Sequence, residues 1–253
     1  MSTYVYCIGH RGLAVPEGLA GVGDPPPAVR VVTEGDLAAV VSDAPLRLRP
    51  SGNDLRAHQT VVHESAVSGP VLPMSFGGVS ADDAAVTAAL AEYAEQFIER
   101  LHALDGRAEY HVKAAHLAES VLHRVLAGHP EIRALLDENR GARRDGQQQR
   151  MRLGELVAGA VKAREAEDAR QVRHALVPLT EAVSVGPENT AWLVNISFLV
   201  GRTSVEEFLS AVERVRKQNP HLDIRITGPL PPYSFVEPVP AGRAGAVADA
   251  ETA

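Results

Sequence analysis

The sequence predicts an α+β protein of two domains: a small mixed α/β domain at the N-terminus, and a modified ferredoxin-like domain with a long helical insertion and an extended C-terminal arm. The chain has 253 residues, and domains commonly contain roughly 100 to 200. From residue 107 onward the predicted order is strand, helices, strand, strand, helix, strand, which is a ferredoxin-like order with an enlarged first connection. We expect domains at 1–106 and 107–236, and a disordered tail at 237–253.

Short apolar runs predict the strands of the first domain. Residues 4–8 form such a run and end at a glycine. Residues 29–33 and 37–41 flank a tight connection at 34–36, whose glycine can take a positive φ, so the two runs should form an antiparallel hairpin. A fourth extended segment, at 71–76, is interrupted by a proline.

Two helices are predicted in the same domain. The first spans residues 54–67, and the second spans 80–104, where Ser80 and Asp83 resemble a capping box. Large apolar residues recur along the second helix at steps of four and three: Val86, Leu90, Tyr93, Phe97, Leu101 and Leu104. This helix should therefore cover a sheet.

The second domain is predicted to begin with a strand and a helical hairpin. Residues 107–113 alternate between apolar and polar side chains, which is typical of a half-buried strand. The hairpin spans about 114–178, with a mobile or frayed tip at 139–149. Its long second helix, at 150–177, carries a narrow apolar stripe, which suits packing against one neighbouring helix.

The remaining elements of the second domain alternate cleanly between strand and helix patterns. We predict a hairpin of two strands, at 181–185 and 190–200. A helix follows, which starts at a capping box of Thr203 and Glu206, and the last strand lies at 222–227. The extended arm follows, and it is predicted from three prolines: Pro229, Pro231 and Pro232.

Charge and composition exclude several classes of protein. The 25 Lys and Arg residues and 32 Asp and Glu residues give a net charge of -7, whereas proteins that coat nucleic acid are expected to be basic. The chain lacks a secretory signal pattern and any apolar run near the roughly 18 residues of a membrane span. Its single cysteine, Cys7, excludes an intramolecular disulfide and cysteine-rich zinc sites. We expect a cytoplasmic protein that binds neither nucleic acid nor membranes.

The ten histidines do not form a recognisable catalytic or metal-binding pattern. No His-Glu-x-x-His motif occurs. His58 and His63 are five residues apart, as are His111 and His116, which places each pair on different faces of a helix. His116 and His123 would share a helix face, but without an acidic partner in register. We therefore predict no catalytic, cofactor-binding or metal-binding residues, no cofactor and no enzymatic activity.

Several segments resemble gas vesicle proteins of the GvpF/GvpL family. Residues 71–77, Val-Leu-Pro-Met-Ser-Phe-Gly, resemble that family's Leu-Pro-x-x-Phe-Gly segment. Residues 226–235, Ile-Thr-Gly-Pro-Leu-Pro-Pro-Tyr-Ser-Phe, resemble its C-terminal signature, Gly-Pro-x-Pro-Pro-Tyr-x-Phe. The start, Tyr-Val-Tyr at 4–6, and the hairpin at 34–42 also fit. The sequence departs from the family pattern at residues 74–75, where a basic residue often precedes the Phe, and in having Gly where Thr is usual at 78.

The resemblance spans about residues 4–236 and implies a cytoplasmic, non-enzymatic role in building gas vesicles. It also implies a two-domain fold with a modified ferredoxin-like C-terminal part. We therefore expect an accessory or minor structural protein that binds the hydrophobic major shell protein, together with other gas vesicle accessory proteins. Four residues are the candidate partner contacts: Met74, Phe76, Tyr233 and Phe235.

Two other classes of function stay open. The first is a small-molecule-binding or catalytic protein that uses the cleft between the two domains, with His10, Arg11 and His63. The second is an adaptor for an anionic partner, which would use four arginines: Arg140, Arg143, Arg144 and Arg150. Electrostatic binding by that adaptor would weaken steeply with salt, whereas capture of an apolar shell subunit would not.

Overall fold

The computed structural model describes residues 1–141, 147–187 and 191–236, and within them it shows seven α-helices and two sheets. The predicted α+β class is confirmed, while the predicted tail at 237–253 lies outside the described residues. The chain forms two compact units. The first unit contains Met1–Glu109 and the arm at 229–236, and the second unit contains Tyr110–Gly228.

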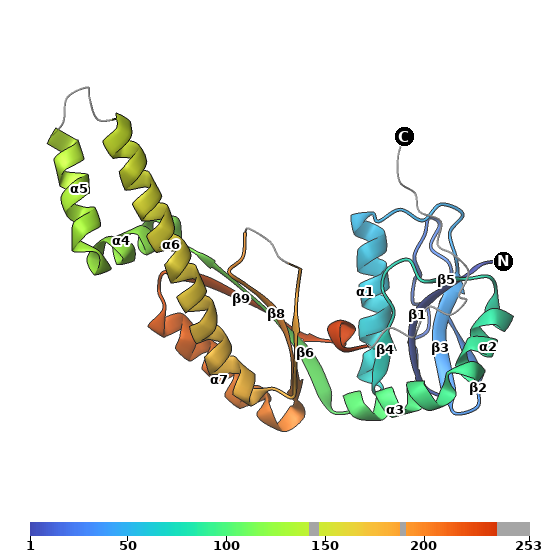
Figure 1. Ribbon diagram of the computed structural model, residues 1–253. Helices are drawn as coiled ribbons and strands as arrows, with labels where there is room; N and C mark the ends of the chain where they lie inside the picture. The colour runs from blue at the N-terminus through green and yellow to red at the C-terminus, as the bar shows by residue number, and fades with distance from the viewer. Residues whose placement is uncertain (142–146, 188–190, 237–253) are drawn as a thin grey trace. The chain divides into compact units, whose positions relative to one another are not determined.

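The sheet of the first unit has the strand order β2-β3-β1-β4, with β5 paired to β1 (Figure 1). Its strands are β1 (Thr3–His10), β2 (Arg30–Glu34), β3 (Leu37–Asp43), β4 (Val71–Pro73) and β5 (Val79–Ser80). The predicted hairpin is confirmed, since β2 and β3 pair antiparallel and Gly35 has a φ of 53°. The segment predicted at 71–76 is a strand only to Pro73, and the chain then turns at Gly77, where φ is 99°.

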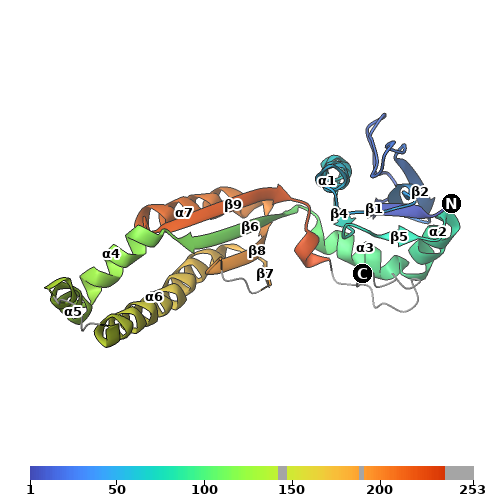
Figure 2. The same ribbon diagram turned by 90° about the horizontal axis from the view of Figure 1, so that it is seen from above.

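Helices cover both faces of this sheet. Strands β1 and β3 are buried along nearly their whole length, which requires cover on each side. Helix α1 (Gly52–Val67) lies on one face, and α2 (Asp83–Glu92) and α3 (Ala94–Leu104) lie on the other (Figure 2).

The single helix predicted at 80–104 is wrong in two respects. Ser80 belongs to β5, and the N-cap is Asp82, whose carboxylate accepts the Ala85 N–H at 2.8 Å. The helix also breaks at Tyr93, where φ is -108° and ψ is 21°. Five of the six predicted apolar residues are buried nonetheless, and only Tyr93, at the break itself, is half-buried.

The sheet of the second unit has the strand order β7-β8-β6-β9. Its strands are β6 (Arg107–His116), β7 (Ala182–Val185), β8 (Val194–Gly201) and β9 (Leu222–Leu230). The chain leaves the first unit within β6 and returns to it within β9. Helix α7 (Val205–Gln218) packs on this sheet through Phe208, whose ring centroid lies 5.5 Å from that of Tyr110 and 5.6 Å from that of Phe198.

The helical insertion contains three described helices: α4 (Ala118–Gly128), α5 (Pro130–Gly141) and α6 (Gln147–Leu176). It starts later than the predicted residue 114, because β6 continues to His116. The narrow stripe of α6 packs against two helices and not against one as predicted: Leu153 and Val157 lie against a small core of Val121 and Val125 from α4 and Ile132 from α5. Part of the tip predicted at 139–149 lies outside the described residues.

The capping box predicted for α7 is not formed. A 3-10 turn at Arg202–Ser204 precedes the helix, so Ser204 takes the N-cap position, and its side chain makes no capping hydrogen bond. Among the described helices, none is both long enough and apolar enough to cross a membrane.

The C-terminal arm lies in the first unit, whereas the predicted division assigned it to the second domain. Polar contacts explain this placement. The Glu109 carboxylate accepts the Ser234 N–H at 2.8 Å and the Ser234 hydroxyl at 2.7 Å. The Arg100 Nε–H donates to the Phe235 carbonyl at 2.9 Å, and the Phe235 side chain is buried.

Candidate functional site

Two of the predicted partner contacts, Met74 and Phe76, lie in the loop between β4 and β5. We call residues 74–78 the aromatic loop. Met74 and Phe76 are half-buried, and Ser75 between them is exposed. The backbone of the loop is tied to β1, because the Met74 N–H donates to the Tyr6 carbonyl at 2.9 Å and the Gly77 N–H donates to the Tyr4 hydroxyl at 3.1 Å.

His58 of α1 holds the aromatic loop from the other side. Its Nε2 lies 3.0 Å from the Met74 carbonyl, and its Nδ1 lies 3.0 Å from the Tyr4 hydroxyl. A carbonyl can only accept, so Nε2 carries the proton, and Nδ1 accepts from the tyrosine. Burial lowers the pKa of His58 despite the opposing effect of the bond to Met74. The ring is therefore neutral and has a partner at both nitrogens.

Aromatic rings from distant parts of the chain surround His58. The ring centroid of Phe76 lies 5.9 Å from that of His58, and the centroid of Tyr233 in the arm lies 6.4 Å from it. Tyr4 lies 6.1 Å from Phe76 and 4.8 Å from Tyr6. The structure therefore brings the aromatic loop and Tyr233 to one place in the first unit.

The other two predicted partner contacts, Tyr233 and Phe235 of the C-terminal arm, are more buried than the aromatic loop. Phe235 is only 7% exposed. The Tyr233 hydroxyl is buried and has no hydrogen-bond partner among the described residues. Burial raises the pKa of Tyr233 well above its usual range, so the phenol stays protonated.

The residues proposed for a ligand site do not gather in the first unit. The His10 ring stacks near that of His102, with centroids 5.6 Å apart, and the Arg11 side chain donates to the Gly35 carbonyl at 3.2 Å. His63 is exposed on α1, and within the described ranges no hydrogen bond or ring contact joins it to His10 or Arg11.

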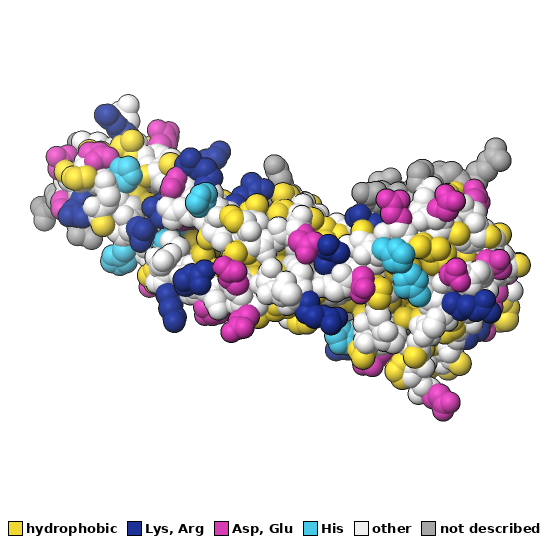
Figure 3. Space-filling view, turned by 90° about the horizontal axis from the view of Figure 1, so that it is seen from below, with side chains coloured by type: hydrophobic (Ala, Val, Ile, Leu, Met, Phe, Trp, Pro, Cys, Tyr) yellow, Lys and Arg dark blue, Asp and Glu magenta, His cyan; other side chains and the backbone are white. Residues whose placement is uncertain are grey.

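Of the four arginines of the predicted anionic site, Arg150 is exposed in the first turn of α6. Arg143 and Arg144 lie outside the described residues, as does the side chain of Arg140. On the face shown in Figure 3, basic and acidic side chains are interspersed over each unit. The described side chains on this face therefore form no continuous basic stripe of the kind that phosphate backbones require.

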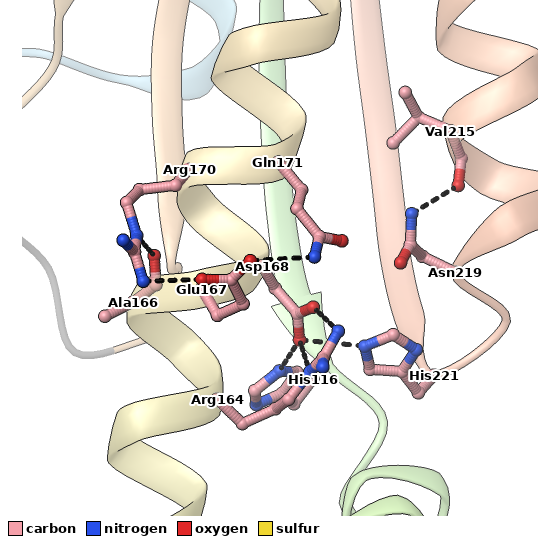
Figure 4. Close-up of polar contacts among 10 residues, drawn as sticks. All are labelled: His116, Arg164, Ala166, Glu167, Asp168, Arg170, Gln171, Val215, Asn219 and His221. Carbon is pink, nitrogen blue, oxygen red and sulfur yellow. Dashed lines mark hydrogen bonds and ion pairs between the residues drawn. The ribbon is translucent and has the colours of Figure 1, made fainter.

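A second polar cluster, which was not predicted from the sequence, lies in the second unit. It contains His116 at the end of β6, Asp168 of α6 and His221 just before β9 (Figure 4). One carboxylate oxygen, Oδ2 of Asp168, accepts from Nε2 of His116 at 2.9 Å and from Nε2 of His221 at 2.8 Å. Arg164 binds the same carboxylate through both of its oxygens, with its Nε 3.0 Å from Oδ2. We call these four residues the histidine–aspartate cluster.

The cluster is buried and carries opposite charges. The side chains of His116, Asp168 and His221 are 8%, 0% and 3% exposed. Burial would raise the pKa of Asp168, but hydrogen bonds from Arg164 and the two imidazoles outweigh it and hold that pKa below its usual range. Burial also lowers the pKa of His221 against the attraction of Asp168. An ionised carboxylate therefore faces imidazole N–H groups.

The cluster was not predicted from the sequence, because its members meet only through tertiary structure. The spacing of His116 and His123 was interpreted as helical, whereas His116 lies at the end of a strand, and its acidic partner lies 52 residues away. One local signal was present. Asp168 precedes Val172 and Leu176 at steps of four, so it occupies a buried position on the stripe of α6. An acid at such a position needs a buried partner.

Comparison with known proteins gives consistent matches. Residues 2–237 match the family model described as gas vesicle synthesis protein GvpL/GvpF. The chain is 52% identical over 238 residues to gas vesicle protein F of Streptomyces sp. (strain CB03234), covering 94% of this chain and 100% of the relative. It is 29% identical over 266 residues to gas vesicle protein L of the same strain, covering 92% and 91%.

Two crystal structures share the fold. One is the gas vesicle protein GvpF from Anabaena sp. PCC7120, with a TM-score of 0.74 and 23% identity over 93% of this chain and 98% of that chain. The other is GvpF from Microcystis aeruginosa, with a TM-score of 0.69 and 22% identity over 93% and 99%. At these identities the likeness supports the arrangement of elements described above.

Proposed function

Since the chain belongs to the GvpL/GvpF family of gas vesicle synthesis proteins, we propose that it is an accessory or minor structural protein of gas vesicle assembly. In this proposal it binds the hydrophobic major shell protein during nucleation or growth of the vesicle, in the cytoplasm and without catalysis. The observation that carries the proposal is the match over residues 2–237, which includes both units and the arm. Other gas vesicle accessory proteins are further partners in this proposal.

The physical need for such a protein is simple. A shell that excludes water is built from subunits with apolar surface, and exposed apolar patches aggregate unless they are covered. Binding at micromolar affinity corresponds to about -8 kcal/mol, which an interface of roughly 1,600 Å² can supply. The proposed role therefore requires no covalent chemistry.

The aromatic loop is the surface that we propose for shell-protein contact. Met74 has a flexible, polarisable side chain that adapts to irregular apolar surfaces, and aromatic residues such as Phe76 often anchor interfaces. The bonds from Tyr4 and His58 hold the loop backbone in place. The loop therefore loses little conformational entropy when a partner binds. Tyr233 and Phe235 complete the proposed set from the arm, but Phe235 is buried, so its part in this proposal is to anchor the arm beside the loop and not to contact the shell protein itself.

We also infer that the second unit is a modified ferredoxin-like fold. Its strand order, β7-β8-β6-β9, is the order expected when the split βαβ arrangement predicted from the sequence closes into one sheet. In this interpretation, α4, α5 and α6 together form the enlarged first connection, and α7 is the second crossover helix.

Co-purification with the candidate shell protein at moderate salt tests the proposed function. The wild-type protein should retain the shell protein, and the double variant Met74→Ala, Phe76→Ala should retain about tenfold less, since a loss of about 1.4 kcal/mol, which truncation of a central contact can cause, is a tenfold change in affinity. The matched control is Met151→Ala, because Met151 is 61% exposed on α6 in the other unit. Retention should change little between low and physiological salt.

If wild-type protein retains no shell protein, and the shell protein stays soluble without it, shell binding is not its function. If the wild type retains shell protein but the double variant does so equally well, the proposed surface is wrong while the function stands.

A further inference from the structure

We propose that His116, Asp168 and His221 form a binding site for a divalent late transition-metal ion, with Zn²⁺ the best-fitting member of that class. The inference goes beyond the proposed function and does not depend on it. Three residues from separate elements converge there, each more than nine-tenths buried, and their ligand atoms all lie within 4.8 Å of one another.

The donor set determines the class of metal. Two imidazole nitrogens and one carboxylate oxygen form a common three-ligand set for zinc, which leaves a fourth position for water or another ligand. Imidazole nitrogen suits Zn²⁺, Co²⁺, Ni²⁺ and Cu²⁺. Mg²⁺ and Ca²⁺ prefer sites made of oxygen, so they should not compete.

The protonation of the two rings allows ligation. In each ring Nε2 points at Oδ2 of Asp168, and Nδ1 of both His116 and His221 has no hydrogen-bond partner within the described part of the chain. No described group therefore donates a hydrogen bond to Nδ1, which would keep the proton on Nε2. The proton can therefore move to Nδ1, and the Nε2 lone pair is then directed toward the carboxylate, where an ion would lie.

Arg164 is the resident cation that a metal ion must displace in part. It binds both oxygens of Asp168, and its own side chain is 22% exposed, so the guanidinium can reach solvent. The bond to Oδ1 can persist as an outer contact while Oδ2 turns to the ion, as ligating carboxylates commonly do. Arg124 also repels positive charge at His221. Removing the charge of Arg164 should therefore tighten metal binding.

Calorimetric titration of the metal-free, full-length, untagged protein with Zn²⁺ at pH 7.5 tests the site. We expect one ion per chain, and a Co²⁺ absorption spectrum of a four-coordinate site. His116→Gln and His221→Gln should each weaken binding by at least about 100-fold, the upper range for loss of an outer partner, whereas Arg164→Gln should tighten it. The matched control, His123→Gln, changes an exposed histidine of α4 and should leave affinity unchanged.

A thermal melt supplies a second reading that needs no variant. At Zn²⁺ about 100-fold above the dissociation constant, the midpoint should rise by roughly 5 °C or more. The proposal is overturned if the wild type binds no Zn²⁺ more tightly than about 10 μM. It is also overturned if binding survives in His221→Gln but is lost in His102→Gln, because the surface pair of His10 and His102 would then be the site.

Discussion

Both units bury histidines in polar networks, but the two networks hold their rings differently. In the first unit His58 has a partner at each nitrogen, namely the Tyr4 hydroxyl and the Met74 carbonyl. In the second unit His116 and His221 each have a partner only at Nε2, and both share the Asp168 carboxylate. A ring bonded at both nitrogens cannot change its tautomer without losing both bonds, whereas a ring bonded only at Nε2 has an Nδ1 that can take the proton when a cation replaces that proton at Nε2. The first network is therefore a fixed support, and the second is open to a cation.

The surroundings of the two networks sharpen this contrast. The rings of Tyr4, Tyr6 and Phe76 enclose His58, so its site favours a neutral group. Asp168 and Arg164 bring full charges into the second network, where each depends on the other for compensation. Loss of one charge should therefore cost more in the second unit than loss of one neutral hydrogen bond in the first.

Removing the Asp168 carboxylate should have the largest effect on stability. Asp168→Ala leaves two buried imidazoles and Arg164 without their acceptor, and breaking a buried charged pair in this way commonly costs about 3 to 5 kcal/mol. The free energy of unfolding can be measured in urea from the fluorescence of Trp192, the only tryptophan in the sequence and a residue of the second unit. Glu167→Ala is the control, because that neighbouring acid pairs with Arg170 at the surface of the same helix. Equal losses in the two variants would show that the buried cluster contributes nothing special.

Removing the Tyr4 hydroxyl should have an intermediate effect. Tyr4→Phe leaves His58 Nδ1 and the Gly77 N–H without their partner, and an unsatisfied buried polar group costs about 1 to 3 kcal/mol. Hydrogen exchange of the β1 amides and of the aromatic loop measures the loss. Tyr93→Phe, at the break between α2 and α3, should leave that protection unchanged. Unchanged exchange in Tyr4→Phe would contradict the assignment of Tyr4 as a support for the loop.

Acidification should produce the smallest effect. The pKa of His58 in the folded protein lies below its ordinary value of 6.5, so the unfolded chain takes up a proton that the folded protein resists. Stability should therefore be constant above about pH 6.5 and fall as the pH drops below it, by at most about 1.4 kcal/mol per pH unit for this one proton. His221 acts in the same direction, so the difference between wild type and His58→Gln isolates His58. Identical pH profiles for the two proteins would rule out this contribution.

The sequence predicted those parts of the fold that local patterns determine. The hairpin at β2 and β3 follows from a tight turn with Gly35, and the buried face of β6 follows from the alternation that includes Tyr110 and Val112. The N-caps of α2 and α7 were mispredicted. Ser80 and Thr203 fit the capping pattern as well as the actual N-caps, Asp82 and Ser204, which lie one or two residues further on. Such choices depend on neighbouring elements that a local pattern does not include.

The candidate sites were predictable to different degrees. The family resemblance indicated Met74, Phe76 and Tyr233, and the structure places all three around His58. The burial of Phe235 was not predictable, since the arm is placed by contacts far away in the chain, such as the bond from Arg100 to the Phe235 carbonyl. The histidine–aspartate cluster was missed for the same reason: its residues converge only when α6, β6 and the start of β9 pack together.

Nitrogen-15 chemical shifts of the imidazole rings, recorded before and after one equivalent of Zn²⁺, give the most direct test. They show whether the tautomer of His58 is fixed while those of His116 and His221 change when the metal ion binds. We predict that His58 shows the Nε2–H tautomer in both spectra. His116 and His221 should change from the Nε2–H form to the Nδ1–H form with Nε2 bound to the metal ion. If His116 and His221 keep their original shifts, or if His58 changes as much as they do, the distinction between the two networks is wrong.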